Sequence, residues 1–130
     1  MVAISIEEHC KNAPKKEFVR DFLIAIATSN LTIAEDMLAE NVILELVGDL
    51  CITEKQVVIQ TLAKDNASRG IKQMTVRNIL SHGNKCAAEG YMRYKDGSEV
   101  AFCHICTFTG HSIDAKIKYI ATYLIEKKPA

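Results

Sequence analysis

The sequence lacks an excess of charge of either sign. Sixteen lysines and arginines balance sixteen aspartates and glutamates in 130 residues. The basic residues are also scattered, and their densest clusters are the pairs 15–16 and 127–128. Because nucleic acids and anionic membrane surfaces attract proteins that carry a basic field, the sequence predicts neither partner.

Long apolar runs are lacking too. None approaches the roughly 18 residues of a membrane span, and Met1–Glu8 has neither the basic start nor the apolar stretch of a signal peptide. Five cysteines, an odd number without regular spacing, favour free thiols in a reducing compartment over a disulfide framework. We therefore expect a cytoplasmic protein with no membrane segment.

What is present is ordinary for a globular protein, with 48% apolar and 25% charged residues. A chain of this length suits one domain that buries roughly two-thirds of its unfolded surface. We expect a single domain over residues 1–130, in which residues 1–14 form an N-terminal extension or a short helix.

The first half of the chain has the spacing of helices. Ser5, Thr32 and Thr53 each begin a capping box, with glutamate or glutamine three residues later. Pro14 suits a first helical turn, and an i, i+4, i+7, i+8 rhythm follows it. The expected helices are a short leading one from Ser5, one over residues 15–30, a short one from Thr32 with inner face Ile33, Ala34, Met37 and Leu38, and one from Thr53 that ends before Ser68.

The second half alternates as strands do. The expected strands are residues 42–48, 72–82, 85–95, 98–109 and 116–125. Gly83-Asn84 and Asp96-Gly97 are the turns, and the second is a strong hairpin signal. In the last strand Ile120 and Leu124 are expected on the face opposite Ile117, Tyr119, Ala121 and Tyr123.

His104 is the one ionisable side chain that strand alternation sends to an apolar face. Successive side chains on a strand point to opposite faces, so His104 shares its face with Val100, Phe102, Cys106 and Phe108. An imidazole in such surroundings is either a satisfied core group or the polar contact of a pocket.

The order of elements predicts an α+β domain with helices on one face of the sheet. It resembles the nuclear-transport-factor-like superfamily, also called SnoaL-like or ketosteroid-isomerase-like. The resemblance covers residues 15–126. It rests on the element order and on three local sequence features. These are residues 31–38 before the first strand, Gly48 at the end of that strand, and Phe108-Thr109-Gly110 at the end of the penultimate strand.

This resemblance implies a cone-shaped fold of three N-terminal helices packed on a strongly curved antiparallel or mixed sheet, with a pocket inside. It also implies a homodimer through the outer face of the sheet. The last strands are apolar on that face as well, where a water-facing sheet would alternate more cleanly. The candidate dimer surface is Ala101, Cys103, Ile105, Tyr119, Ala121 and Tyr123; the alternative is that terminal segments cover this face.

The residues do not carry the catalytic sets that this fold hosts. In register with the ketosteroid isomerases, the functional positions fall on Phe22, Leu46 and His104, and neither Phe22 nor Leu46 can exchange a proton. The Asp-Arg-Asp group of the limonene epoxide hydrolases has no match. His104 alone could serve a cyclase-type reaction as general acid or base. Its possible orienting carboxylates, Asp21 and Asp36, are expected to face solvent.

Two further alternatives involve neighbours of His104. Dehydratases of this fold pair two histidines, and His82, expected at the pocket rim, is the only plausible second one. Cys86, Cys106 and His104 are soft ligands that could hold zinc or copper, but buried free cysteines usually act as small apolar fillers. We predict no metal and no cofactor.

Three functions therefore stay open. The first is binding of a small, mostly apolar molecule in an enclosed pocket with His104 as its main polar contact. The second is a cyclase, isomerase or dehydratase that uses His104, and the third is a dimerisation module whose interior is filled by side chains. The predicted pocket residues are Phe18, Phe22, Leu46, Met92, Phe102, His104, Cys106 and Thr122.

Overall fold

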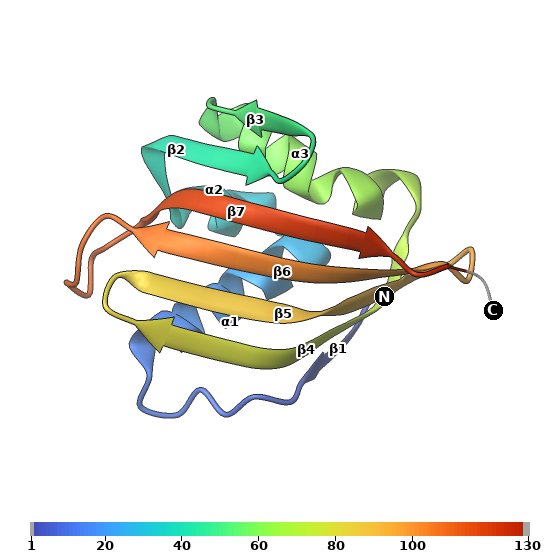
Figure 1. Ribbon diagram of the computed structural model, residues 1–130, viewed down its shortest axis with the longest axis horizontal. Coiled ribbons are helices and arrows are strands. Elements are labelled where there is room, and N and C mark those ends of the chain that lie inside the picture. Colours follow the sequence, from blue (N-terminus) through green and yellow to red (C-terminus); the bar gives the residue numbers. More distant parts are fainter. Residues whose placement is uncertain (1, 129–130) are drawn as a thin grey trace.

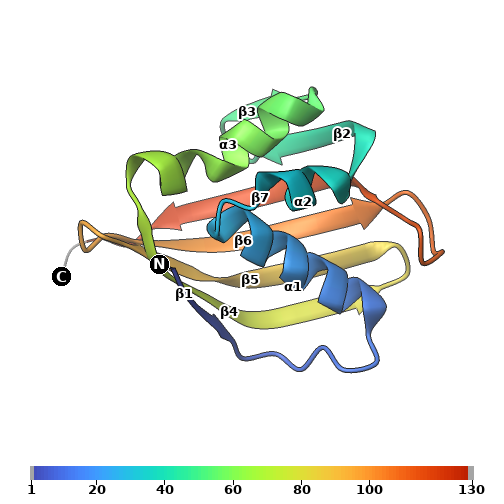
Figure 2. The ribbon, with the colours of Figure 1, turned by 180° about the vertical axis from the view of Figure 1, so that it is seen from behind.

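The computed structural model describes residues 2–128, which form an α+β fold with helices on one face of a mixed seven-stranded sheet (Figures 1 and 2). The helices are α1 (Pro14–Ala27), α2 (Leu31–Asp36) and α3 (Lys55–Ser68). The strands are β1 (Ala3–Ile6), β2 (Leu38–Leu46), β3 (Leu50–Ile52), β4 (Ile71–His82), β5 (Lys85–Tyr94), β6 (Glu99–Phe108) and β7 (Ile117–Glu126). They lie in the order β1-β4-β5-β6-β7-β2-β3. The expected domain also includes residue 1 and residues 129–130, which lie outside the described part, so its boundaries stay a prediction.

Helix α1 supplies the main contact between helices and sheet. It starts with a proline in its first turn, as expected, and buries Val19, Phe22, Leu23 and Ile26. Figure 2 shows α1 lying across the face of the sheet that the helices cover. Its apolar stripe forms the core together with inward side chains of α3, β2 and β4 to β7.

Helix α2 corrects one sequence prediction. It starts after Asn30, and the capping box expected at Thr32 does not begin it. Ala34 is fully buried, whereas Ile33 is 52% exposed, so the predicted inner position of Ile33 is wrong. Consecutive residues on a helix point about 100° apart. Turning Ala34 into the core therefore turns Ile33 outward.

Two short strands were not predicted. The segment at Ser5, expected to start a helix, lies instead in β1, where Ile4 pairs in parallel with Met74 of β4. Strand β3 pairs antiparallel with β2 and follows a turn at Gly48, whose φ of 83° suits glycine. An N-cap residue stabilises a helix by about 1 kcal/mol. In β1 the backbone pairing with β4 outweighs this helical preference.

A bulge reverses the expected face of Ile117. Tyr119 pairs with Thr107 but Ile117 pairs with Phe108, so β7 holds one extra residue between them. Ile117 is consequently fully buried on the same side as Ile120, and its predicted place on the outer face is wrong. Strand alternation predicts the face of a residue correctly only within a stretch that contains no bulge.

Gly90 allows a close approach of β4 and β5. A Cβ atom built on this residue would lie 1.9 Å from the carbonyl oxygen of Thr75, closer than any real contact. The position falls beside a register shift between Val76 and Asn78 of β4. Only a residue without a side chain fits here.

None of the helices in the described residues is both long and apolar enough to span a bilayer. The expected cytoplasmic location stays a prediction.

Candidate functional site

A partly open cavity of about 370 Å³ lies between α1, α3 and the sheet. Its lining is mostly apolar side chains, with His104 and Thr122 on the sheet side. Six of the predicted pocket residues line it: Phe22, Leu46, Met92, Phe102, His104 and Thr122. Phe22, Leu46 and His104, the three positions read from the resemblance, thus meet at one cavity.

His104 is held by a hydrogen bond across the sheet. It lies directly opposite Thr122 in the β6–β7 register, and its Nδ1 is 2.8 Å from Thr122 Oγ1. The ring of Phe102, two residues away on the same face, packs 5.1 Å from the imidazole centroid. The orientation of the imidazole is therefore set by two strands, with no loop involved.

The other ring nitrogen of His104 faces the cavity. Among the described side chains, every enclosed nitrogen or oxygen has a hydrogen-bond partner. The ring makes its hydrogen bond through Nδ1. Nε2 is therefore not enclosed by protein, and it opens into the cavity that the ring lines. On its sheet side the cavity thus offers an occupant one ring nitrogen among apolar side chains.

Burial keeps His104 uncharged at neutral pH. The side chain is 9% exposed, and removal from water lowers its pKa from 6.5 to about 4. A neutral imidazole has one nitrogen that donates and one that accepts. Because the Thr122 hydroxyl can either donate to or accept from Nδ1, both tautomers are compatible with this pair.

The carboxylates that could orient His104 for general acid–base catalysis lie elsewhere. Asp21 pairs with Arg20 at 2.9 Å, and Asp36 lies 3.8 Å from Lys116. In the described part of the chain, neither a carboxylate nor a second imidazole hydrogen-bonds to His104. No cluster of three metal-ligating side chains is found among these residues either.

Cys106 and Phe18 are placed away from this cavity. Cys106 shares the inward face of β6 but is packed in the core, where burial raises the pKa of its thiol. Cys86, directly opposite on β5, has its pKa raised to about 11 by the same desolvation. Phe18 lies one helical turn before Phe22 and lines a different hollow.

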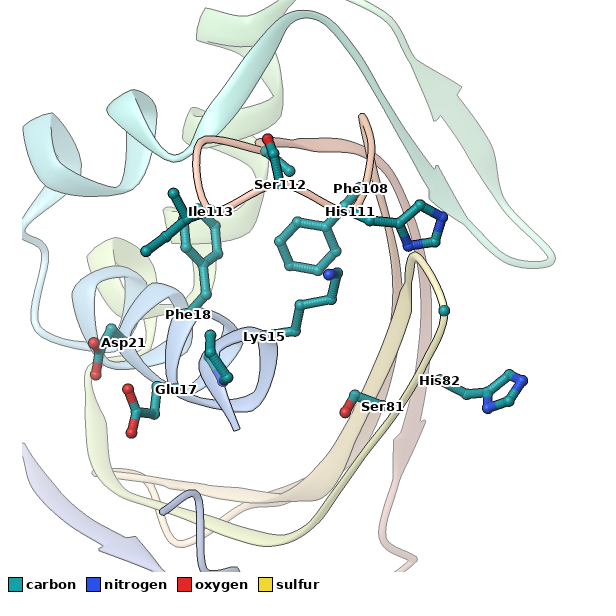
Figure 3. A pocket seen from close by; sticks show the side chains of 13 residues that line it. Lys15, Glu17, Phe18, Asp21, Ser81, His82, Phe108, His111, Ser112 and Ile113 are labelled. Carbon is teal, nitrogen blue, oxygen red and sulfur yellow. The ribbon is translucent and has the colours of Figure 1, made fainter. Parts of the chain in front are cut away.

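That second hollow is an open cleft of about 760 Å³ at the other end of α1 (Figure 3). Its walls are the start of α1, the β4–β5 turn, the end of β6 and the loop between β6 and β7. His82, expected at the rim of the His104 pocket, lines this cleft instead, together with His111. The strand placement of His82 was right, but β4 carries it away from His104.

The mouth of the cavity holds residues that sequence reasoning missed. Leu50 and Ile52 of β3, Asp49 of the preceding turn, and Thr61 and Lys64 of α3 all line it. Asp49, Leu50 and Ile52 were missed because β3 was not predicted, whereas Thr61 and Lys64 lie on a helix that was predicted without a role at the cavity. The available signal was the turn at Gly48 followed by a short apolar run, which is typical of a tight return strand.

No protein-family model and no curated protein matches this sequence. Solved structures do match its fold. An NTF-2 like protein of unknown function from Burkholderia xenovorans LB400 aligns with a TM-score of 0.73 over 94% of this chain and 91% of that one, at 16% identity. A candidate ketosteroid isomerase from Kribbella flavida aligns with a TM-score of 0.73 over 90% and 82%, at 14% identity.

An LEH-like epoxide hydrolase from M. tuberculosis aligns with a TM-score of 0.66 over 86% of this chain and 83% of that one, at 17% identity. At identities this low, the similarity shows only the fold. Proteins named for different activities share that fold. The chain has the NTF2-like fold.

Proposed function

We propose that this chain, which has the NTF2-like fold, binds a small and mostly apolar molecule in the cavity beside His104. One observation carries the proposal: an apolar cavity of about 370 Å³ with a single oriented imidazole nitrogen open to it. Small-molecule sites typically combine apolar walls with a few fixed polar groups, and their volumes start near 300 Å³.

The ligand carries a neutral polar group at its buried end. Because the pKa of His104 is lowered to about 4, the imidazole supplies no positive charge at neutral pH. A carboxylate beside it would be buried without a counter-charge, which is costly. A hydroxyl can both donate and accept, so it satisfies Nε2 in either tautomer.

The experiment compares two ligands that differ by one hydroxyl, 2-naphthol and naphthalene. The chain has no tryptophan, so the naphthyl fluorescence can be followed without an indole background. We expect 2-naphthol to bind roughly two- to tenfold more tightly than naphthalene, as one neutral hydrogen bond allows. In His104→Leu this preference disappears while naphthalene still binds. A protein that binds neither compound, or keeps the preference after the substitution, contradicts the proposal.

An exposed histidine provides the matched control. His9 lies outside the cavity and is solvent-exposed. His9→Gln is expected to leave both affinities unchanged, which separates a local effect at the cavity from a general effect of losing an imidazole.

Catalysis by His104 is the weaker alternative. A general base of this kind is normally oriented by a third group, such as a carboxylate, and the Nδ1 partner here is the hydroxyl of Thr122. The lowered pKa also makes the imidazole a weak base. The third alternative, an interior filled by side chains, predicts no cavity beside Phe102 and Met92, yet both residues line one.

The outer face of the sheet is the proposed homodimer surface. Cys103 and Ile105 of β6 and Ala121 of β7 are half-buried there, and Tyr123 is 42% exposed. No described terminal segment encloses them, since all four keep solvent contact. A second copy of the chain would remove this apolar surface from water, at about 25 cal/mol per Å².

A further inference from the structure

The open cleft at the start of α1 is separate from the cavity of the proposed function. The two hollows share no lining residue, although Phe18 of one and Phe22 of the other are a single helical turn apart. A ligand in the cleft would therefore contact a different set of side chains. An inference about the cleft stands independently of the proposed function.

A lysine without an anionic partner stands at the centre of the cleft. Lys15 is half-buried, and its Nζ lies 5.7 Å from the ring centroid of Phe108. With the side chains that the structure describes, the side chain of Lys15 makes no ion pair and no hydrogen bond. Figure 3 shows it extending toward Phe108 and His111.

The nearby carboxylates do not neutralise Lys15. Glu17 is two residues further along α1, and residues two apart on a helix do not face each other. Asp21 is engaged by Arg20 at 2.9 Å. In Figure 3 both carboxylates lie on the side of the cleft away from His111. The cleft thus has one wall with an unpaired cation.

The floor and rim of the cleft are apolar. Phe18 and Phe108 pack edge to face, with ring centroids 5.3 Å apart. Above them Ile113, in the loop between β6 and β7, is 90% exposed (Figure 3). Phe108 is 1% exposed, so the half-buried Phe18 is the aromatic ring that a flat ligand ring can reach, and Ile113 gains apolar contact if such a ring lies beside it.

We propose that this cleft binds a small aromatic carboxylate, whose ring packs on Phe18 beside Ile113 and whose carboxylate meets Lys15 Nζ. Lys15 is the only lysine or arginine in the lining, so a group with one negative charge matches it. The His111 side chain, on the same side of the cleft, is a second donor for the carboxylate. No covalent step is involved.

The test uses 2-naphthoate and backbone amide NMR spectra at pH 7. We expect saturable shifts at the amides of Phe18, His111 and Ile113. In Lys15→Gln, which keeps the chain length and removes the charge, Kd rises about fivefold, the upper end for a partly exposed ion pair. Lys72, exposed on β4, is the matched control, and Lys72→Gln leaves Kd unchanged.

A second variant tests the apolar rim. Ile113→Ser removes a side chain that is 90% exposed, so folding is unaffected and only the contact with the ring is lost. We expect weaker 2-naphthoate binding in this variant. The proposal is overturned if no amide shift saturates, if the shifts map to Phe102 and Thr122 of the other hollow, or if Lys15→Gln and Lys72→Gln weaken binding equally. Shifts at Phe102 and Thr122 would place a carboxylate in the cavity of the proposed function and contradict its preference for a neutral group, whereas the other two outcomes leave 2-naphthol binding beside His104 untouched.

Discussion

Acid should destabilise the protein through His104. In the folded state burial lowers the pKa of this imidazole to about 4, whereas the unfolded chain returns it to 6.5. Between these values the unfolded state binds more protons than the folded state. Stability then rises with pH, so it is complete above pH 6.5 and falls progressively as the pH drops toward 4.

The size of the effect follows from the two pKa values. Each pH unit inside the window changes the free energy of unfolding by up to 1.36 kcal/mol. At pH 5 the ratio of the two protonation factors gives a loss of about 2 kcal/mol relative to pH 7.5. With an ordinary urea m value, this loss lowers the midpoint of denaturation by on the order of 1 M.

Other groups also titrate in acid, so the assay compares variants. Urea denaturation is measured at pH 7.5 and pH 5 for the unmodified protein, His104→Gln and His9→Gln. His104→Gln should lose about 2 kcal/mol less than the unmodified protein between the two pH values. His9→Gln should behave like the unmodified protein. Equal losses in all three proteins would refute a buried, neutral imidazole at position 104.

Two more predictions test the sheet. Ile105→Asp places a charge on the proposed homodimer surface and is expected to give a monomer at 20 µM by light scattering. The same change at Ile33, which is exposed on α2, is expected to leave the dimer intact. If the unmodified protein is itself a monomer, the proposed homodimer surface is contradicted. Gly90→Ala forces a methyl group onto the backbone of β4 and should lower the free energy of unfolding by roughly 3 kcal/mol in urea titrations. Gly110→Ala, where a Cβ meets nothing within 4 Å, should change it by less than about 1 kcal/mol. Equal effects at the two glycines would contradict the close approach.

Local pattern predicted the central hairpins well. The turn at Asp96-Gly97 is confirmed by the hydrogen bond from the Tyr94 amide to the Ser98 carbonyl, and β5 and β6 begin and end within a residue of the expected positions. These strands alternate regularly, and their turn residues are adjacent in sequence. The short strand β1 has no such signal, and it forms because β4, far along the chain, offers free backbone groups. Strand β3 pairs with β2 across the turn at Gly48, but its three residues are too few to show a clear alternation.

The sequence predicted which face of its helix or strand each site residue occupies, but not how far along that element the cavity extends. Helical and strand periodicities place Phe18 with Phe22, and Cys106 with His104, and both pairs do share a face. Periodicity does not say how far along the axis a hollow extends. One helical turn is 5.4 Å and two strand residues span about 6.6 Å, which is enough to move Phe18 into the cleft and Cys106 into the core.

The outermost strands of the sheet, β1 and β3, hold four and three residues. Each leaves only a few unsatisfied backbone donors and acceptors for another chain to extend the ladder, and natural proteins use this shortness to avoid joining edge to edge. Fibrillar growth by strand addition is blunted where these two strands form the margin. On the proposed homodimer surface, by contrast, a two-fold contact between two copies would close on itself and stop.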